Sequence, residues 1–399
     1  MKYLLLDDDT ERAERWKSTI SLSAKSISVD VFDTKKVSEL ISNLHKGRLD
    51  ARKDTYKRVN DLNEYDLIII DYDLLGLEEN GGTAWSTGAE LAYAIRLMCD
   101  VGPIIVVNQY GTNPFDLTMK RTVSSYADQD LGGHQITNPG LWQSNSFSDF
   151  RPWHWPNLSL EPARFNAMRD FILNNLDKSI IQTLGFEILD FSSARFIGHD
   201  ILGKIGINDT ATTFRELIQE NREIAVFNVL DKDIDIIKKM DDPQLARLTS
   251  VIIWQWLEKV VLPNQEVLSD LPHLAPKMPW ILKDYTSEES WNSICDLEIP
   301  TAIIDEIEKY QFSPDFLFTR PVYWSEEAKQ AIGIPSGFSI DKISDLVFCE
   351  DASCFSPRTS ASNYPSDLLA FDKERWVKDK LTSDDTEVNY EPQSYLLMM

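Results

Sequence analysis

Cysteine is scarce in this sequence, which has only four in 399 residues. So few thiols in a chain of this length exclude a disulfide-stapled framework. Two of them, Cys349 and Cys354, enclose the stretch Glu-Asp-Ala-Ser, but no second Cys or His pair stands nearby at the spacing of a zinc site. We therefore expect ordinary buried or half-buried cysteines, with Cys99 in the core.

Long hydrophobic runs are also missing. The opening run Tyr3–Leu6 stops at three aspartates, and the later run Val251–Trp256 is far shorter than the roughly 20 apolar residues that cross a bilayer. We recognise neither a secretory signal nor a membrane span, and so we expect a cytoplasmic protein that does not bind membranes.

Basic residues are too few to balance the acidic ones: 40 Lys and Arg stand against 64 Asp and Glu, a net charge of −24. The richest basic run, Lys46–Arg58, is interleaved with Asp50 and Asp54, which is typical of a solvated helix face. A duplex-binding protein needs a basic surface, because phosphate neutralisation supplies much of its affinity. We therefore expect no nucleic-acid partner.

Recognisable catalytic motifs are absent as well. The sequence has no phosphate-binding loop of the Walker or G-x-G-x-x-G type. Its five histidines are scattered, and neither His199 nor His273 belongs to a recognisable nucleophile motif. We assign no catalytic residue, although an enzyme within residues 160–399 stays open.

What the sequence does contain is apolar material for packed cores, with 43% hydrophobic residues and enough length for two or three domains. Its N-terminal part alternates short apolar runs with helical patterns. The expected elements are strands at Lys2–Leu6, Ile27–Phe32, Asp66–Asp71 and Pro103–Val107, and helices from Thr10, as cap, to about Leu22, within 34–62 and at Gly88–Met98. This order predicts an α/β fold with a doubly wound parallel sheet.

The rest of the chain has a mostly helical pattern. We expect a long helix at Glu161–Phe186, further helices within 212–262 and at Pro300–Tyr310, an irregular stretch at Pro263–Pro279, and short strands after residue 312. The predicted parts are a sheet domain at 1–150, a mostly α-helical domain at 151–311, a small mixed α+β region at 312–382 and an acidic tail at 383–399.

Three aspartates follow strands of the predicted sheet. Asp7 and Asp8 come directly after the first strand, and Asp71 ends the third. In open parallel sheets, ligands bind at the carboxyl ends of the strands. Carboxylates are the ligands that Mg²⁺ prefers, and an aspartate beside such an ion can attack a phosphoryl donor. The sequence therefore predicts a metal and phosphoryl site at this edge.

At these positions the chain resembles the receiver domain of two-component response regulators, over residues 1–150. The matching stretches are Leu4–Asp9, Leu67–Asp71, Gly88–Leu91 and Pro103–Val107. The resemblance implies a five-stranded, flavodoxin-like fold, Mg²⁺ held by Asp7, Asp8 and Asp71, and phosphorylation of Asp71. It also implies a histidine kinase or another protein as partner.

The chain departs from the receiver pattern at the residues that would contact the phosphoryl group. Asn108 ends the fourth strand where receivers have Thr or Ser, and Asn138 precedes Pro139 where they have Lys after the fifth strand. Lys120 could supply the missing positive charge. The loop after Asp71 is lengthened by Leu77–Ser86.

These features favour a regulatory protein whose receiver-like domain responds to Mg²⁺-dependent phosphorylation or to partner binding. Its output would be a protein contact, and a homodimer stays open. The alternative is an adaptor with an inactive receiver in a multi-component prokaryotic system, including defence systems. The altered positions Asn108 and Asn138 permit that alternative.

Overall fold

The computed structural model describes residues 1–53, 55–80, 85–108, 126–142, 151–153, 155–188, 211–220, 230–262, 265, 267–295, 300–363 and 376–378. These residues form two compact units. Unit 1 takes in the described residues within 1–142 and 157–256, and unit 2 those within 151–156 and 257–378. The helical residues within 157–256 thus share a unit with the N-terminal sheet, across the boundary that we placed at residue 150.

Unit 1 is built on a parallel sheet whose five strands run in the order β2-β1-β3-β4-β5. The strands are β1 (Lys2–Leu6), β2 (Ser28–Phe32), β3 (Leu67–Asp71), β4 (Ile104–Asn108) and β5 (Gln129–Gly132). Residue Leu4 of β1 pairs with Asp30 of β2 and with Ile68 of β3. Both β3 and β4 are buried along their whole length, as apolar runs are when both faces of a parallel sheet are covered. The predicted five-stranded parallel sheet is confirmed, with the strand order of flavodoxin-like proteins.

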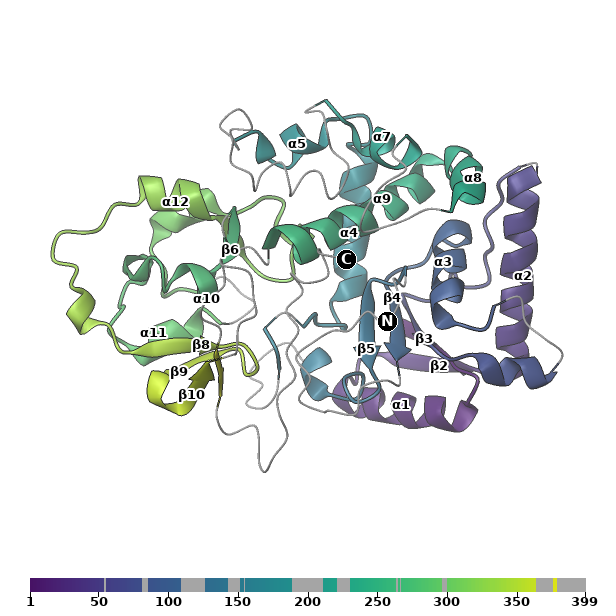
Figure 1. Ribbon diagram of the computed structural model, residues 1–399, viewed down its shortest axis with the longest axis horizontal. Helices are drawn as coiled ribbons and strands as arrows, with labels where there is room; N and C mark the ends of the chain where they lie inside the picture. The colour runs from purple at the N-terminus through teal and green to yellow at the C-terminus, as the bar shows by residue number, and fades with distance from the viewer. Residues whose placement is uncertain are drawn as a thin grey trace. The chain divides into compact units, whose positions relative to one another are not determined.

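Three helices connect these strands: α1 (Thr10–Ser23), α2 (Thr34–Lys53) and α3 (Gly88–Met98). Figure 1 shows α1 on one side of the sheet and α2 and α3 next to each other on the other side. Helix α2 ends at Lys53, well short of the end of the predicted helical stretch 34–62. Helix α3 begins at the cap Thr87, whose side chain accepts the Glu90 N–H.

The start of α1 differs from the prediction by one residue. The carboxylate of Asp9 accepts the backbone N–H groups of Glu11 and Arg12, so Asp9 is the N-cap and Thr10 is the first helical residue. Three residues therefore separate the end of β1 from the first helical residue. The first turn of α1 consequently stays at the carboxyl edge of the sheet.

Further helices complete unit 1: α4 (Glu161–Leu173), α5 (Ile180–Thr183), α7 (Phe214–Gln219), α8 (Ile234–Lys238) and α9 (Asp242–Trp256). Helices α4 and α9 pack along each other, with the rings of Phe165 and Trp254 5.5 Å apart. The long helix expected at Glu161–Phe186 is wrong, because α4 ends at Leu173 and a turn separates it from α5.

Polar contacts join α9 to the sheet layer. The Gln244 side chain donates to the carbonyl oxygens of Arg96 and Cys99, at 3.2 and 3.0 Å. Arg247 Nε donates to Asp100 Oδ1 at 2.6 Å. These buried donors bond the last turn of α3 and the chain just after it, so α9 is an integral layer of unit 1.

Unit 2 is smaller and mixed. Its strands are β6 (Leu268–Asp270), β7 (Val322–Trp324), β8 (Leu346–Cys349), β9 (Cys354–Pro357), β10 (Ala361–Asn363) and β11 (Trp376–Lys378), and its helices are α10 (Leu271–Leu274), α11 (Glu288–Ser293) and α12 (Ser325–Ala331). Strands β6 and β7 form an antiparallel pair, and the other four form a sheet in the order β10-β11-β8-β9. The stretch Pro263–Pro279, which we expected to be irregular, contains the strand β6 and the helix α10. Of the helix expected at Pro300–Tyr310, only Asp305–Tyr310 is helical, as a 3₁₀ segment.

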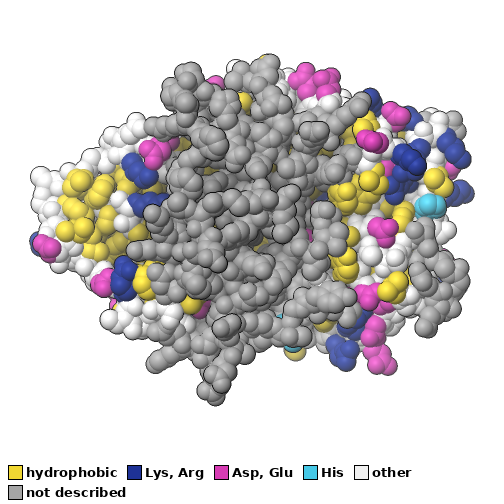
Figure 2. All heavy atoms as spheres, in the orientation of Figure 1, with side chains coloured by type: hydrophobic (Ala, Val, Ile, Leu, Met, Phe, Trp, Pro, Cys, Tyr) yellow, Lys and Arg dark blue, Asp and Glu magenta, His cyan; other side chains and the backbone are white. Residues whose placement is uncertain are grey.

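Acidic and basic side chains are interspersed over the described part of unit 1 on the face shown in Figure 2. Among the helices that the structure describes, none is long and apolar enough to cross a membrane.

Candidate acidic pocket

The three predicted aspartates meet at one edge of the parallel sheet. Asp7 and Asp8 follow β1, and Asp71 is the last residue of the neighbouring strand β3. One carboxylate oxygen from each lies within 4.8 Å of the others. Asp7 and Asp71 are fully buried, whereas the Asp8 side chain keeps 13% of its surface exposed. The expected convergence is therefore present, and oxygen donors at this spacing fit a hard divalent cation.

A fourth residue, Arg12, lies between the carboxylates. Its Nη2 is 2.6 Å from Asp7 Oδ1, 2.6 Å from Asp71 Oδ2 and 3.2 Å from Asp8 Oδ1. Its Nε donates to Asp7 Oδ2 at 2.9 Å, which makes the contact with Asp7 a two-point one. Arg12 stands one helical turn after Asp8, so the start of α1 brings its side chain over the pocket. Sequence reasoning missed Arg12, although a base four residues after the acidic pair was the available signal.

Two backbone N–H groups hold the acidic pair in place. The N–H of Asp9 donates to Asp7 Oδ1 at 2.8 Å, and the N–H of Gly76 donates to Asp8 Oδ2 at 2.7 Å. A Cβ atom at position 76 would lie only 2.7 Å from Asp8 Oδ2. Glycine at position 76 therefore lets the loop after β3 approach the carboxylate closely.

A second glycine supports the strand that carries Asp71. A Cβ atom at Gly88, the first residue of α3, would lie 2.2 Å from the backbone oxygen of Asp71. The Gly88 N–H donates to the carbonyl of Tyr72 at 2.7 Å. The close packing of α3 on the end of β3 thus depends on a residue without a side chain.

The pocket carries more negative than positive charge. The hydrogen bond to Asp7 is the largest cause that raises the pKa of Arg12, so the guanidinium stays charged. Burial, and then the negative charge of Asp7, raise the pKa of Asp8 against the opposing effect of the Gly76 N–H. Among the described residues, Arg12 is the one base paired with these three carboxyl groups, so the pocket has more acidic than basic groups and attracts cations.

The other predicted contact residues occupy different surroundings. Asn108 ends β4 and is 3% exposed, on the strand next to the one that carries Asp71. Asn138 caps a short 3₁₀ turn, where its Oδ1 accepts the N–H of Gly140 at 2.7 Å. Lys120 lies outside the described residues. Of the predicted set, the structure thus brings together Asp7, Asp8 and Asp71.

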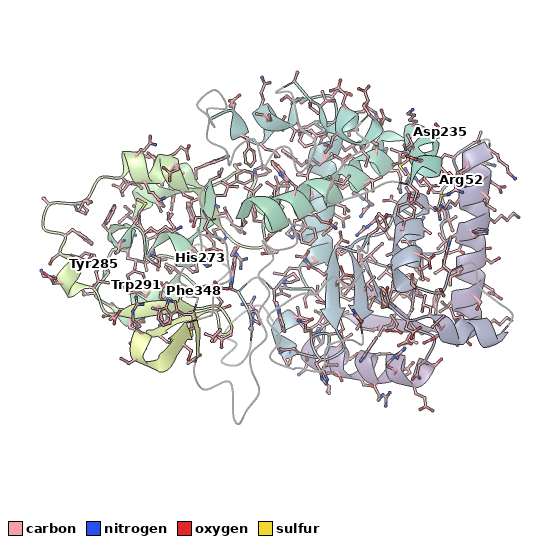
Figure 3. The ribbon with its side chains drawn as sticks, viewed as in Figure 1. Arg52, Asp235, His273, Tyr285, Trp291 and Phe348 are labelled. Carbon is pink, nitrogen blue, oxygen red and sulfur yellow. The ribbon has the colours of Figure 1, made fainter. Side chains whose placement is uncertain are left out.

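Unit 2 contains a separate buried charge network that sequence reasoning did not select. His273 Nδ1 lies 2.6 Å from Asp270 Oδ1 and His273 Nε2 lies 3.6 Å from Glu350 Oε1. Arg320 Nε lies 3.1 Å from Asp270 Oδ2. Figure 3 shows His273 beside Phe348, and their ring centroids are 5.2 Å apart. Each acid of this network lies beside a base, as buried charges require.

The charge of His273 depends on its acidic neighbours. Burial alone would lower the pKa of His273, but attraction by Asp270 and hydrogen bonds to Asp270 and Glu350 raise it to about 9. The same histidine holds the pKa of Asp270 below its ordinary value despite full burial. A small pocket beside Asp270 and Arg320 is also lined by Trp153, Cys295 and Ser353. We assign no chemistry to it.

Comparison with known proteins found no family model that matches this sequence, no similar curated protein and no similar solved structure.

Proposed function

We propose that the sheet of unit 1 is a receiver-type regulatory module in which Asp71 accepts a phosphoryl group. The observation that carries this proposal is the meeting of Asp7, Asp8 and Asp71 within 4.8 Å at the carboxyl edge of a five-stranded parallel sheet. Oxygen ligands at the end of two adjacent strands are suited to Mg²⁺, which retains water and takes one or two carboxylates together with phosphate oxygens. When bound, the ion would neutralise charge on the transferring group.

The residues of the chain have distinct parts in this reaction. A carboxylate oxygen of Asp71 attacks the phosphorus of the donor, the bond from phosphorus to the leaving group breaks, and the leaving group departs with the electron pair. Asp7 and Asp8 would hold the cation, and the Asp9 and Gly76 N–H groups orient these two carboxylates. Asn108, at the end of β4, offers an amide as donor to the phosphoryl oxygens.

We propose a protein contact as the output of this module, in a cytoplasmic signalling protein. The net charge of −24 and the mixed charges on the face in Figure 2 support a protein partner over a nucleic acid. Helix α3 begins beside Asp71, and α9 is hydrogen-bonded to Cys99 and Asp100 just after the end of α3. A change at the acidic pocket could therefore reach the helical layer through α3.

The phosphoryl transfer can be tested with acetyl phosphate and Mg²⁺. We expect intact-protein mass spectrometry to show one added phosphoryl group that hydroxylamine removes, as an acyl phosphate requires. Asp71→Asn should abolish the gain. Asp50→Asn, the same change at an exposed position of α2, should leave it unaltered.

The adaptor is the second candidate, and the position of Arg12 favours it, since a guanidinium already contacts all three carboxylates. The phosphoacceptor proposal would be contradicted if the folded protein gains no phosphoryl group from acetyl phosphate and Mg²⁺ and none from a histidine kinase. The adaptor would then be the better description.

A further inference from the structure

We propose that Arg12 is a built-in counterion of the acidic pocket and competes with a divalent cation for the same three carboxylates. This inference rests on the proposed metal-dependent function and adds a regulatory step to it. The pocket would then have two exclusive arrangements, one closed by Arg12 and one that holds the cation with the Arg12 side chain withdrawn.

The exclusion follows from the distances. Nη2 of Arg12 lies within 3.2 Å of an oxygen from each of Asp7, Asp8 and Asp71, so it occupies the space between them. A Mg²⁺ ion at its usual oxygen distance of about 2.1 Å would need that same space. Two positive centres so close together would also repel each other strongly in a buried site. Either cation can be there, but not both.

The structure allows Arg12 to leave without disturbing the helix that carries it. Its side chain is 19% exposed, so the guanidinium has a path to solvent. Helix α1 is capped by Asp9 and anchored by buried Ala13, Trp16 and Ile20, none of which needs the Arg12 side chain. The guanidinium carbon already lies 5.6 Å from the centre of the Trp16 ring, which offers a cation–π contact beside the pocket.

The competition is set by charge and by tethering. The cation must replace the hydrogen bonds that Arg12 makes to the three carboxylates. Because the backbone of α1 keeps the guanidinium close to these carboxylates, the effective concentration of this competitor is high. A divalent ion neutralises one more unit of charge than the guanidinium does. We therefore expect weak cation binding in the natural chain and tighter binding once Arg12 loses its charge.

Isothermal calorimetry with MgCl₂ at constant ionic strength tests this competition. We expect Arg12→Gln to bind Mg²⁺ at least tenfold more tightly than the natural chain. Arg15→Gln is the matched control, since it removes an equal charge from an exposed position of α1; its affinity should equal that of the natural chain. The double variant Arg12→Gln with Asp7→Asn should lose the gain.

The thermal midpoint gives a second readout that needs no phosphorylation. Without Arg12 the carboxylates repel one another, so Arg12→Gln should melt at a lower temperature without Mg²⁺. Added Mg²⁺ should raise the melting temperature of this variant more than that of the natural chain.

If this variant fails to fold, the competition can be followed in the natural chain by the nuclear magnetic resonance signal of the Arg12 Nε–H group, assigned with Arg12→Lys. That resonance should shift as Mg²⁺ saturates the pocket.

The outcomes separate the two proposals. Equal Mg²⁺ affinity in the natural chain and in Arg12→Gln, or an unshifted Nε–H resonance at saturating Mg²⁺, would overturn the counterion role and leave the metal site standing. An absence of Mg²⁺ binding in both folded proteins would overturn the metal-dependent function and the counterion role with it. Tighter binding confined to Arg12→Gln supports both.

Discussion

Arg48 and Asp233 form a two-point ion pair across 185 positions of the sequence, with Arg48 Nη2 2.6 Å and Nε 3.2 Å from Asp233 Oδ2. Asp233 is fully buried and also accepts hydrogen bonds from Arg52 at 2.7 Å and from the Tyr93 hydroxyl at 2.9 Å. Figure 3 shows Arg52 where α2 faces the segment that carries Asp235. One carboxylate thus joins α2 and α3 to the start of α8.

We predict that Asp233→Ala destabilises unit 1 by about 3–5 kcal/mol, because it leaves two half-buried arginines without their buried counterion. Urea denaturation followed by tryptophan fluorescence measures this loss. Asp235→Ala, at an exposed position two residues away, should change the free energy of unfolding by less than about 0.5 kcal/mol. Similar losses for both variants would contradict the buried clamp.

The same carboxylate predicts an acid dependence. Burial opposes the charge, but the hydrogen bonds from Arg48 and Arg52 hold the pKa of Asp233 below its ordinary value. A lowered pKa contributes stability that is present above the ordinary value and is lost as the pH falls through the lowered one. Below about pH 4, the natural chain should therefore lose more stability than Asp233→Asn. Parallel pH profiles of the free energy of unfolding would contradict this.

His273 predicts the opposite trend in unit 2. Its pKa is raised to about 9, so its contribution is complete below the unfolded value near 6.5 and is lost as the pH rises through 9. The loss is on the order of 3 kcal/mol. His273→Gln should abolish this decline between pH 6.5 and 9.5 in denaturation experiments, whereas His134→Gln, at an exposed position, should retain it.

The close packing of Gly88 on the end of β3 predicts a steric effect of substitution. Gly88→Ala should destabilise unit 1 by more than about 2 kcal/mol, because the new Cβ atom would lie 2.2 Å from a backbone oxygen that cannot move aside easily. Gly133→Ala is the control in the same unit, since its Cβ atom would meet only Trp16, at an ordinary 3.9 Å. Equal thermal midpoints for the two variants would contradict the close approach of α3 to β3.

The register of β8 and β9 can be tested by oxidation. Cys349 and Cys354 pair directly across the two strands, and opposed residues have Cα distances of roughly 4.5–5.5 Å, within the range of a disulfide. Diamide should therefore link these two in preference to Cys99 or Cys295, as peptide mapping would show. Burial raises the pKa of both thiols, that of Cys349 to about 12, so the reaction should accelerate with pH. A different cysteine pairing would contradict the register.

The sheet could be predicted because three of its strands are short apolar runs and a fourth, Ser28–Phe32, alternates polar and apolar residues, all at the spacing of an α/β fold. The fifth strand could not be located in that way. Its segment Gln129–Gly132 is polar, and it follows Asp128, which is buried against Arg96 of α3. Arg96 and Asp128 are 32 positions apart in the sequence. Because only the folded chain brings these two partners together, their ion pair leaves no local pattern in the sequence.

The acidic pocket was predictable for a related reason: the carboxyl ends of neighbouring parallel strands must meet, so Asp7 and Asp71 converge wherever the strand order is right. Arg12 was missed because its role depends on the orientation of one side chain over the pocket. The end of α4 was missed because the apolar spacing continues past Leu173, although Asn174 and Asn175 turn the chain there.

One contact on the first strand bears on how the chain folds during synthesis. The Tyr3 hydroxyl donates to the Leu158 carbonyl oxygen at 2.7 Å, and α9, which ends at Trp256, bonds to the segment after α3. The sheet and helices α1 to α3 therefore leave the ribosome long before α4 and α9, which complete the packing of unit 1. We expect the nascent N-terminal half to wait in an incomplete state, and a chaperone that shields apolar surface to associate with it until translation passes residue 256.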